Sequence, residues 1–223
     1  MIKITNLNKT FNENTKKEFH ALKNINLEIK TSSCVILKGI SGSGKSTLLS
    51  IIGTLLKPTS GEIKIDEDSI AKLPDLHASN FRARRLGFIF QSYNLFNELS
   101  VKDNIAITLI PLGFTQKQIN EMVLKAMNLA NIEHKKDELV YNLSGGEKQR
   151  CAIARALVNN PDIILCDEPT ANLDHDNSIN FIESLRELKK LNKTIIVATH
   201  DPIFEKLDFV DEIINIKNGI ICE

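Results

Sequence analysis

The stretch GISGSGKST, at residues 39–47, decides the fold of this chain. It fits the pattern Gly-x-x-x-x-Gly-Lys-Ser, in which a glycine-rich backbone wraps closely around phosphate oxygens. The apolar run CVILK (34–38) precedes it and a helical pattern follows from about Lys45, which is the strand–loop–helix context that the motif requires. We therefore predict a phosphate-binding loop made of Gly39, Ile40, Ser41, Gly42, Ser43, Gly44, Lys45, Ser46 and Thr47.

Two side chains of this loop have defined chemical roles. Lys45 should reach the β- and γ-phosphates of a nucleoside triphosphate, and the Ser46 hydroxyl should ligate Mg²⁺. The apolar run IILCDEP (163–169) is typical of a buried strand that delivers Asp167 and Glu168 at its carboxyl end, where α/β sheets bind ligands. Asp167 would hold the magnesium ion, directly or through water, and Glu168 would polarise a water that attacks the γ-phosphate. Such a carboxylate pair can instead cap the next helix, but together with a phosphate loop it favours nucleotide hydrolysis.

Strand-like and helical segments alternate along the chain, which favours an α/β core with a mostly parallel sheet. Strand patterns occur at residues 1–7, 24–30, 34–39, 61–66, 85–91, 162–169 and 193–201. Helical patterns occupy about 94–160, where Thr115 can cap one helix, and return in NFIESLRELKKL (180–191). The last segment, EIINIKNGIICE (212–223), is typical of a hairpin around its Asn-Gly pair. We predict a single domain over 1–223, into which a helical subdomain from about 94 to 160 is inserted.

Composition and charge exclude several classes of function. The chain has 28 cationic and 28 anionic residues, so no overall basic field recruits nucleic acid or anionic lipid. Cys34, Cys151 and Cys166 lie in apolar runs without Cys-x-x-Cys or zinc-ligand spacing, and we predict them to be small core residues. The start MIKITNLNKTF is neither a signal nor a transit peptide, which favours a reducing cytosol. No apolar run approaches the roughly 20 residues that cross a bilayer, so we expect another chain to span the membrane if this protein works there.

The stretch LSGGEKQR (143–150) predicts a helix N-terminus suited to an anion. Ser144 and Glu147 have the Ser-x-x-Glu spacing of a capping box. The N-terminus of a helix presents unpaired N–H groups and about half a positive charge, which suits phosphate. Standing alone, the stretch would indicate an ordinary capped helix. Downstream of a phosphate loop, it suggests a second phosphate contact.

Taken in order, these residues resemble the nucleotide-binding subunits of ATP-binding-cassette (ABC) transporters. The resemblance covers essentially the whole chain and includes, besides the phosphate loop, Gln91 after a strand, LSGGE (143–147), IILCDE (163–168), NLD (172–174) and His200 after a strand. LSGGE downstream of a phosphate loop is highly specific to this superfamily. The resemblance implies a P-loop ATPase fold of the ABC type, which adds an antiparallel β subdomain to the α/β core and the inserted helical subdomain.

The resemblance also implies why the second phosphate contact exists. Two copies of such a subunit pack head to tail, and each ATP, with its Mg²⁺, lies between one copy's phosphate loop and its partner's LSGG helix. Ser144, Gly145 and Gly146 would therefore contact the γ-phosphate that is bound to the other copy. We expect the Glu147 carboxylate, which an anion would repel, to turn back onto the helix cap.

The remaining site residues are assigned by the same resemblance. Gln91 would contact Mg²⁺ or the attacking water, and His200 would hold the γ-phosphate and orient that water. Asp174 would lie at the seam of the dimer. Phe11 is the candidate for the aromatic ring that stacks on adenine, although Phe19 competes with it and tyrosine is commoner at this position in the family.

FIFQSYNLFNELSVKDNI (88–105) and NLSGGEKQRCAIARAL (142–157) are most similar to the lipoprotein-releasing, macrolide-efflux and cell-division group. Ala171, where the group usually has glycine, and TSSC (31–34) depart from the pattern. In this group the subunit is peripheral on the cytoplasmic face of the cell membrane and drives integral membrane permease subunits, without touching substrate or nucleic acid. In this group the permease inserts a short helix into a groove near the segment after Gln91. The residues expected to line that groove here are Tyr93, Leu95, Phe96 and Leu99.

Other functions of the same superfamily remain as alternatives. A cassette of this group can transmit force to a cell-wall or division complex without moving a substrate. A DNA-maintenance ATPase head would place long coiled coils between Lys45 and Ser144, but no sustained heptads occur there. A translation factor of this superfamily would carry two cassettes in one chain, and this chain carries one.

Overall fold

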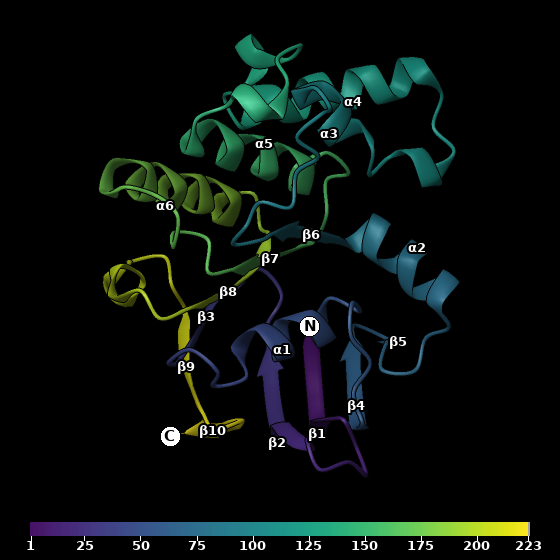
Figure 1. Cartoon of the computed structure of the whole chain (residues 1–223), viewed down its shortest axis with the longest axis vertical. Coiled ribbons are helices and arrows are strands. Elements are labelled where there is room, and N and C mark those ends of the chain that lie inside the picture. The colour runs from purple at the N-terminus through teal and green to yellow at the C-terminus, as the bar shows by residue number, and fades with distance from the viewer. Residues whose placement is uncertain (223) are drawn as a thin grey trace. The chain divides into compact units, whose positions relative to one another are not determined.

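The computed structural model, drawn in Figure 1, describes residues 1–222. The chain divides into two compact units. The first unit comprises residues 1–79 together with 189–222, and the second comprises residues 80–188. Each unit contains paired strands covered by helices, which confirms the α/β class.

An antiparallel sheet forms one part of the first unit. Its strands, in the order β2-β1-β4-β5, are β2 (Phe19–Ile29), β1 (Ile2–Phe11), β4 (Ser60–Ile65) and β5 (Asp68–Ser69). Ile2 pairs with Ile29 on one side and with Ile65 on the other, and all three side chains are buried. Lys3, which lies between the buried Ile2 and Ile4 of β1, is exposed, as expected for a strand with one buried face. The predicted strands at 1–7, 24–30 and 61–66 and the antiparallel subdomain are thus confirmed.

The parallel strands of the first unit are centred on β3 (Cys34–Lys38), which pairs in parallel with β8 (Thr194–Thr199) and β9 (Glu212–Lys217). β10 (Ile220–Cys222) returns antiparallel to β9. Asn218 and Gly219 between them have φ of 52° and 77°, as a tight hairpin turn requires. Helix α1 (Lys45–Ile52) packs on β8 and β2, and the short 3-10 helix η4 spans Pro202–Lys206.

The second unit joins a parallel strand pair to a group of helices. β6 (Leu86–Ile89) pairs in parallel with β7 (Ile163–Asp167), and α5 (Gly145–Leu157) packs on β6. Helices α3 (Val101–Ala106) and α4 (Gln116–Leu129) pack on α5 and on each other. This unit also contains η1 (Ile110–Leu112), η2 (Glu133–Lys135), η3 (Val140–Asn142) and most of α6 (His175–Lys190). Thr115 and Gln118 form a capping box at the start of α4, so the predicted cap is confirmed.

Two elements differ from the expectations drawn from the sequence. Helix α2 (Asp75–Arg85) was not expected, because Ala78 is its only buried residue and it therefore has no apolar stripe to reveal a helical period. The strand expected over 85–91 ends at Ile89, which pairs with Cys166, so Gln91 lies in the loop beyond the strand.

The cysteines behave as expected for core residues. Cys34, Cys151 and Cys166 are fully buried and reduced. Burial raises the pKa of Cys34 and of Cys151 to about 12, so these thiols stay protonated. In the described part of the chain, residues 1–222, no helix combines the length and apolar character needed to span a bilayer.

Candidate nucleotide site

The phosphate loop connects β3 to α1 in the first unit and needs glycine at defined positions. Gly42 and Gly44 have φ of 76° and 108°, in the region that favours glycine. A Cβ on Gly44 would lie 2.8 Å from the carbonyl oxygen of Ala21, which is too close for any side chain. Gly44 precedes α1 and provides no side-chain cap for it, and the N-terminus of a helix carries a partial positive charge that suits an anion.

Polar atoms inside this loop fit a polyphosphate. Lys45 is only 4% exposed, and its Nζ donates to the carbonyl oxygens of Gly39 (2.7 Å) and Ile40 (3.1 Å). The Ser43 hydroxyl is buried and has no hydrogen-bond partner among residues 1–222, a state that proteins rarely tolerate. A bound phosphate oxygen would accept from this hydroxyl and would neutralise the buried ammonium group. The phosphate-loop residues therefore suit the anion that the motif predicts.

His200 lies at the same sheet edge as the phosphate loop. Lys38 and Thr199 are register partners on the parallel strands β3 and β8, so Gly39 and His200 follow directly after paired residues. The next residue, Asp201, accepts a hydrogen bond from the Ile203 N–H (3.0 Å) and so caps η4. Parallel sheets bind ligands at this carboxyl edge.

The two aromatic candidates for adenine lie at the far end of β1 and the start of β2. Phe11 pairs with Phe19 across the antiparallel ladder. Phe19 is 56% exposed, whereas the Phe11 ring is half-buried with the Lys9 ammonium group 5.1 Å from its centre. The geometry does not favour one ring over the other, and stacking of Phe11 on adenine remains a prediction.

In the second unit, the carboxylates and Gln91 gather at the ends of paired strands. Asp167 is the last residue of β7, and Glu168 follows it with φ of 44°. A positive φ is uncommon for glutamate and is often found at functional sites. The carbonyl oxygen of Gln91 accepts a hydrogen bond from the Asn172 amide (2.8 Å), which ties the loop after β6 to the loop after β7.

The LSGG segment begins α5 with the predicted capping box. The Ser144 hydroxyl accepts from the Glu147 N–H (3.3 Å), and a Glu147 carboxylate oxygen accepts from the Ser144 N–H (2.8 Å). Glu147 also forms an ion pair with Lys135 (3.3 Å). The bond from the Ser144 N–H is the main reason that the pKa of Glu147 is lowered, despite partial desolvation. The carboxylate is therefore turned back onto the cap, as expected, and the other N–H groups of the first turn are left to an anion.

Two sets of contacts that the sequence did not suggest hold the loop after β7, one from α5 and one from the start of α6. The buried Gln149 donates from Nε2 to the carbonyl oxygen of Pro169 (3.3 Å). Asn177 donates from its backbone N–H (2.8 Å) and from its side-chain amide (2.9 Å and 3.0 Å) to the carboxylate of Asp174. These bonds lower the pKa of Asp174, the backbone bond contributing most. A lone amide on a helix has no sequence signature, so only the fold reveals these contacts.

A third unexpected residue, Arg155, holds the segment after Gln91 against α5. Its guanidinium donates to the carbonyl oxygens of Tyr93 (2.6 Å) and Asn94, and burial lowers its pKa. Tyr93 and Asn94 have φ of 59° and 50°, so Arg155 binds both carbonyls of a left-handed pair. Of the apolar residues expected to form a groove here, Tyr93, Leu95 and Leu99 are half-buried and Phe96 is 51% exposed.

Comparison with known proteins gives the class to which this fold and these motifs belong. The family described as "ABC transporter" matches residues 22–171. The chain belongs to this family, which is one of ABC-type ATPases, and its fold is that of an ATP-binding cassette. The resemblance drawn from the motifs is thus confirmed.

The chain is also similar to individual proteins of this family. The chain is 41% identical over 221 residues to the macrolide export ATP-binding/permease protein MacB of Campylobacter fetus, covering 99% of this chain and 34% of that protein. It is 39% identical over 220 residues to the lipoprotein-releasing system ATP-binding protein LolD of Pseudoalteromonas translucida, covering 98% and 94% respectively. This chain therefore spans about a third of the MacB relative but nearly all of the LolD relative. A solved dimer of the ATP-binding cassette MJ0796, in a post-hydrolysis state with ADP and Pi, matches with a TM-score of 0.90 at 38% identity, covering 100% of this chain and 97% of that one.

Proposed function

We propose that this chain is a Mg²⁺-dependent ATPase that dimerises head to tail around two ATP molecules and drives a separate membrane permease. The observation that carries the proposal is that one chain contains two elements whose geometry suits an anion. One is a loop that encloses the buried Lys45. The other is a 13-residue helix, α5, whose only first-turn carboxylate, Glu147, is turned back onto its cap. A single bound nucleotide needs the first element, and a nucleotide shared between two copies also uses the second.

Each site residue then has a role in phosphoryl transfer. Lys45 and His200 would bind the γ-phosphate, and Glu168 would fix the attacking water in line. Mg²⁺ would be held by Ser46, Gln91 and Asp167, and when bound it neutralises charge on the phosphates. Within residues 1–222, no three His, Cys, Asp or Glu side chains form a cluster that could hold a metal. This is compatible with Mg²⁺, which usually takes few protein ligands and keeps phosphate and water oxygens.

The partner contacts in the dimer follow from the same arrangement. Ser144, Gly145 and Gly146 would meet the γ-phosphate on the partner copy, and Asp174 would lie at the seam. The dimeric cassette MJ0796 supports this assembly by analogy. Phosphate release would remove the bridge between the copies and loosen the dimer, since charge-assisted bonds to the γ-phosphate hold them together.

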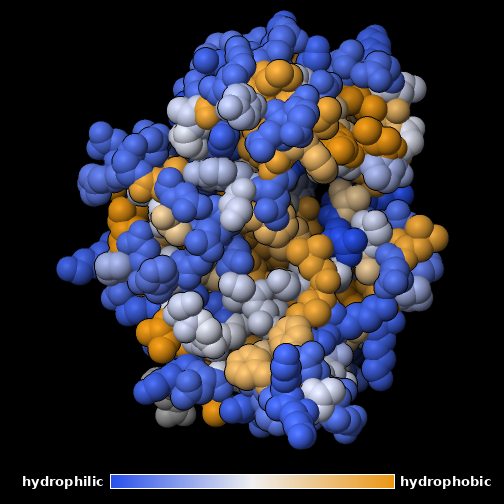
Figure 2. Space-filling view, in the orientation of Figure 1, coloured by the Kyte–Doolittle hydropathy of each residue, from blue (hydrophilic) through white to orange (hydrophobic). Residues whose placement is uncertain are grey.

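The membrane partner is proposed from the relatives and from the exposed apolar surface. MacB is an export ATP-binding/permease protein and LolD belongs to a lipoprotein-releasing system, so we propose export or lipoprotein release. In that role the chain would be cytoplasmic and would attach to the inner face of the membrane through its permease. Figure 2 shows hydrophobic surface over the region of α3 and α4. In this part of the chain Ile110 of η1 is 66% exposed, and Leu124 and Leu129 of α4 are 44% and 59% exposed. Together with Phe96, these side chains offer the apolar area that a permease segment would cover.

The experiment is to replace Glu168 by Gln, which keeps the size of the side chain and removes its charge. ATP turnover should fall to background, because the attacking water is no longer polarised, and ATP should then trap a dimer that light scattering detects. Glu13→Gln is the matched control, since Glu13 lies exposed in the loop after β1. Turnover of Glu168→Gln at the wild-type rate would contradict the role of Glu168.

A further inference from the structure

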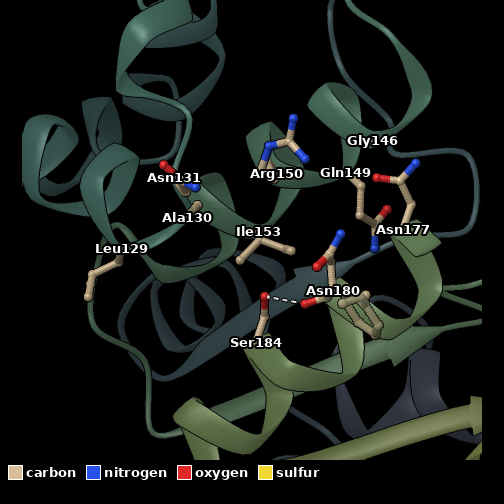
Figure 3. Close-up of a pocket in the computed structure, with 11 residues that line it drawn as sticks. Leu129, Ala130, Asn131, Gly146, Gln149, Arg150, Ile153, Asn177, Asn180 and Ser184 are labelled. Atoms are coloured by element: carbon tan, nitrogen blue, oxygen red, sulfur yellow. Dashed lines mark hydrogen bonds between the residues drawn. The ribbon is translucent and has the colours of Figure 1, made fainter.

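The amide of Asn177 lies between two segments that the proposed dimer places at its seam. On one side it donates to both carboxylate oxygens of Asp174. On the other side its oxygen lies against Gly146, in the first turn of α5 (Figure 3). One side chain thus contacts both the loop after β7 and the LSGG helix.

The orientation of this amide is fixed by charge. An ionised carboxylate only accepts hydrogen bonds, so the NH₂ group of Asn177 must face Asp174. The amide oxygen is then the atom that faces Gly146. Rotating the amide by half a turn would set two oxygens against each other and lose both bonds.

Gly146 leaves no room for a side chain on this face. The three atoms nearest to a Cβ at position 146 all belong to Asn177: its oxygen is the closest, Cγ lies at 2.9 Å and Nδ2 at 3.2 Å. A Cβ on the neighbouring Gly145 would meet nothing closer than the Tyr93 hydroxyl at 3.8 Å. The two glycines of LSGG therefore differ in the space around them, and only Gly146 packs against the Asn177 side chain that binds Asp174.

A cavity beside this contact gives Asn177 space to move. Its volume is about 250 Å³, and it lies between α5, α6 and the end of α4. Asn177 and Asn180 of α6 face Gly146, Gln149 and Ile153 of α5 across it (Figure 3). A methyl group on Gly146 can therefore displace the Asn177 side chain into the cavity and release Asp174, while the helices stay packed.

We infer that Asn177 is a positioning residue, which keeps Asp174 of the seam and Gly146 of the LSGG helix in a fixed relative placement. The inference rests on the proposed ATP-driven dimer and adds to it a specific coupling within each copy. When the dimer closes, the Asp174 loop and the LSGG helix of one copy then approach the partner's nucleotide as one unit.

The first test uses the nucleotide-free chain and asks whether the contact exists. Gly146→Ala and Asn177→Ala should each raise the pKa of Asp174 part of the way toward its ordinary value, as followed by carbon NMR of its carboxyl group, because both remove the side-chain amide donor and leave the backbone N–H donor of residue 177 in place. Gly145→Ala should leave that pKa unchanged. An Asp174 titration that is the same in Gly146→Ala as in the wild type would overturn the inference.

The second test asks whether the contact matters for closure, using a double-mutant cycle in the Glu168→Gln background. Gly146→Ala alone should weaken ATP-driven dimerisation about tenfold or more, whereas in the Asn177→Ala background it should add less than about threefold, because the atoms it displaces are gone. Asn177→Leu, which keeps a similar shape and loses the donor without adding a charge beside Asp174, should weaken dimerisation with a melting temperature within about 4 °C of the parent. Asn180→Ala, on the same helix and cavity, should change dimerisation less than about twofold.

The outcomes separate the two proposals. If the Glu168→Gln parent stays monomeric with ATP, the dimer and the coupling built on it both fail. If the parent dimerises and the effects of Gly146→Ala and Asn177→Ala simply add, the coupling alone fails.

Discussion

Substitutions at Ser144 can separate the helix cap from the phosphate contact, because the two roles need different chemistry. The hydroxyl accepts from the Glu147 N–H at 3.3 Å, and in the proposed dimer it also donates to a phosphate. Alanine removes both functions. Aspartate keeps an acceptor at the cap but presents a negative charge to the phosphate.

The magnitudes follow from this geometry. Losing an N-cap side chain costs about 1 kcal/mol, which lowers the melting temperature of a chain of this size by about 2–4 °C. Aspartate should leave the melting temperature close to that of the wild type, since its attraction to the helix N-terminus is opposed by the nearby Glu147 carboxylate. Two unit charges about 4 Å apart repel by about 1 kcal/mol in bulk water and about 4 kcal/mol near a protein surface. Ser144→Asp should therefore weaken each shared ATP site between about fivefold and a thousandfold.

The assays are thermal melting without nucleotide and ATP-driven dimerisation in the Glu168→Gln background. Ser144→Ala should show the lower melting temperature, and Ser144→Asp should show the greater loss of dimer. Dimerisation of Ser144→Asp at the level of its parent would refute the contact between Ser144 and phosphate. A wild-type melting temperature for Ser144→Ala would refute the energetic role of the cap.

Two further predictions concern residues that hold α5 in place. Because the pKa of Glu147 is lowered from its ordinary value of 4.5, the ionised carboxylate stabilises the fold at pH values above 4.5. This stabilisation is lost as the pH falls below 4.5 through the folded-state pKa. Denaturant titrations at neutral and at acid pH should therefore show a smaller loss of stability on acidification for Glu147→Gln than for the wild type, and an equal loss would contradict the assignment. Arg155→Lys should destabilise the chain by about 1–3 kcal/mol in the same denaturant titration. The reason is that an ammonium group cannot bind the Tyr93 and Asn94 carbonyls in the fork geometry of a guanidinium. Arg84→Lys, on the exposed surface of α2, is the control and should leave the stability unchanged.

The sequence predicted those parts of the fold and site whose chemistry is local. The phosphate loop, the Ser144–Glu147 box and the Asn218–Gly219 hairpin each depend on a few consecutive residues, and each forms as expected. Helix α2 was not predicted, because it buries only Ala78 and its larger apolar residues, Leu76 and Phe81, are five positions apart and form no helical stripe.

The contacts that tie the site together could not be predicted, because they join residues far apart in the chain. Arg155 reaches back to Tyr93, and Asn177 lies against Gly146. Neither pairing follows from spacing or periodicity, which report only neighbours along one helix or strand. Nothing in the sequence around Arg155 or Asn177 distinguishes them from other arginines and asparagines, and only the fold shows their partners.

The most direct test of the shared site is complementation between two inactive variants. Lys45→Ala disables the phosphate loop and Ser144→Arg blocks the LSGG helix, so neither variant alone should form an ATP-driven dimer. In a head-to-tail pair of the two, one of the two ATP sites combines the intact loop of one copy with the intact helix of the other, and mixing should restore dimerisation and partial turnover. A chain carrying both substitutions should rescue nothing when mixed with either variant. If the mixture of single variants stays monomeric and inactive, each ATP is not shared between copies.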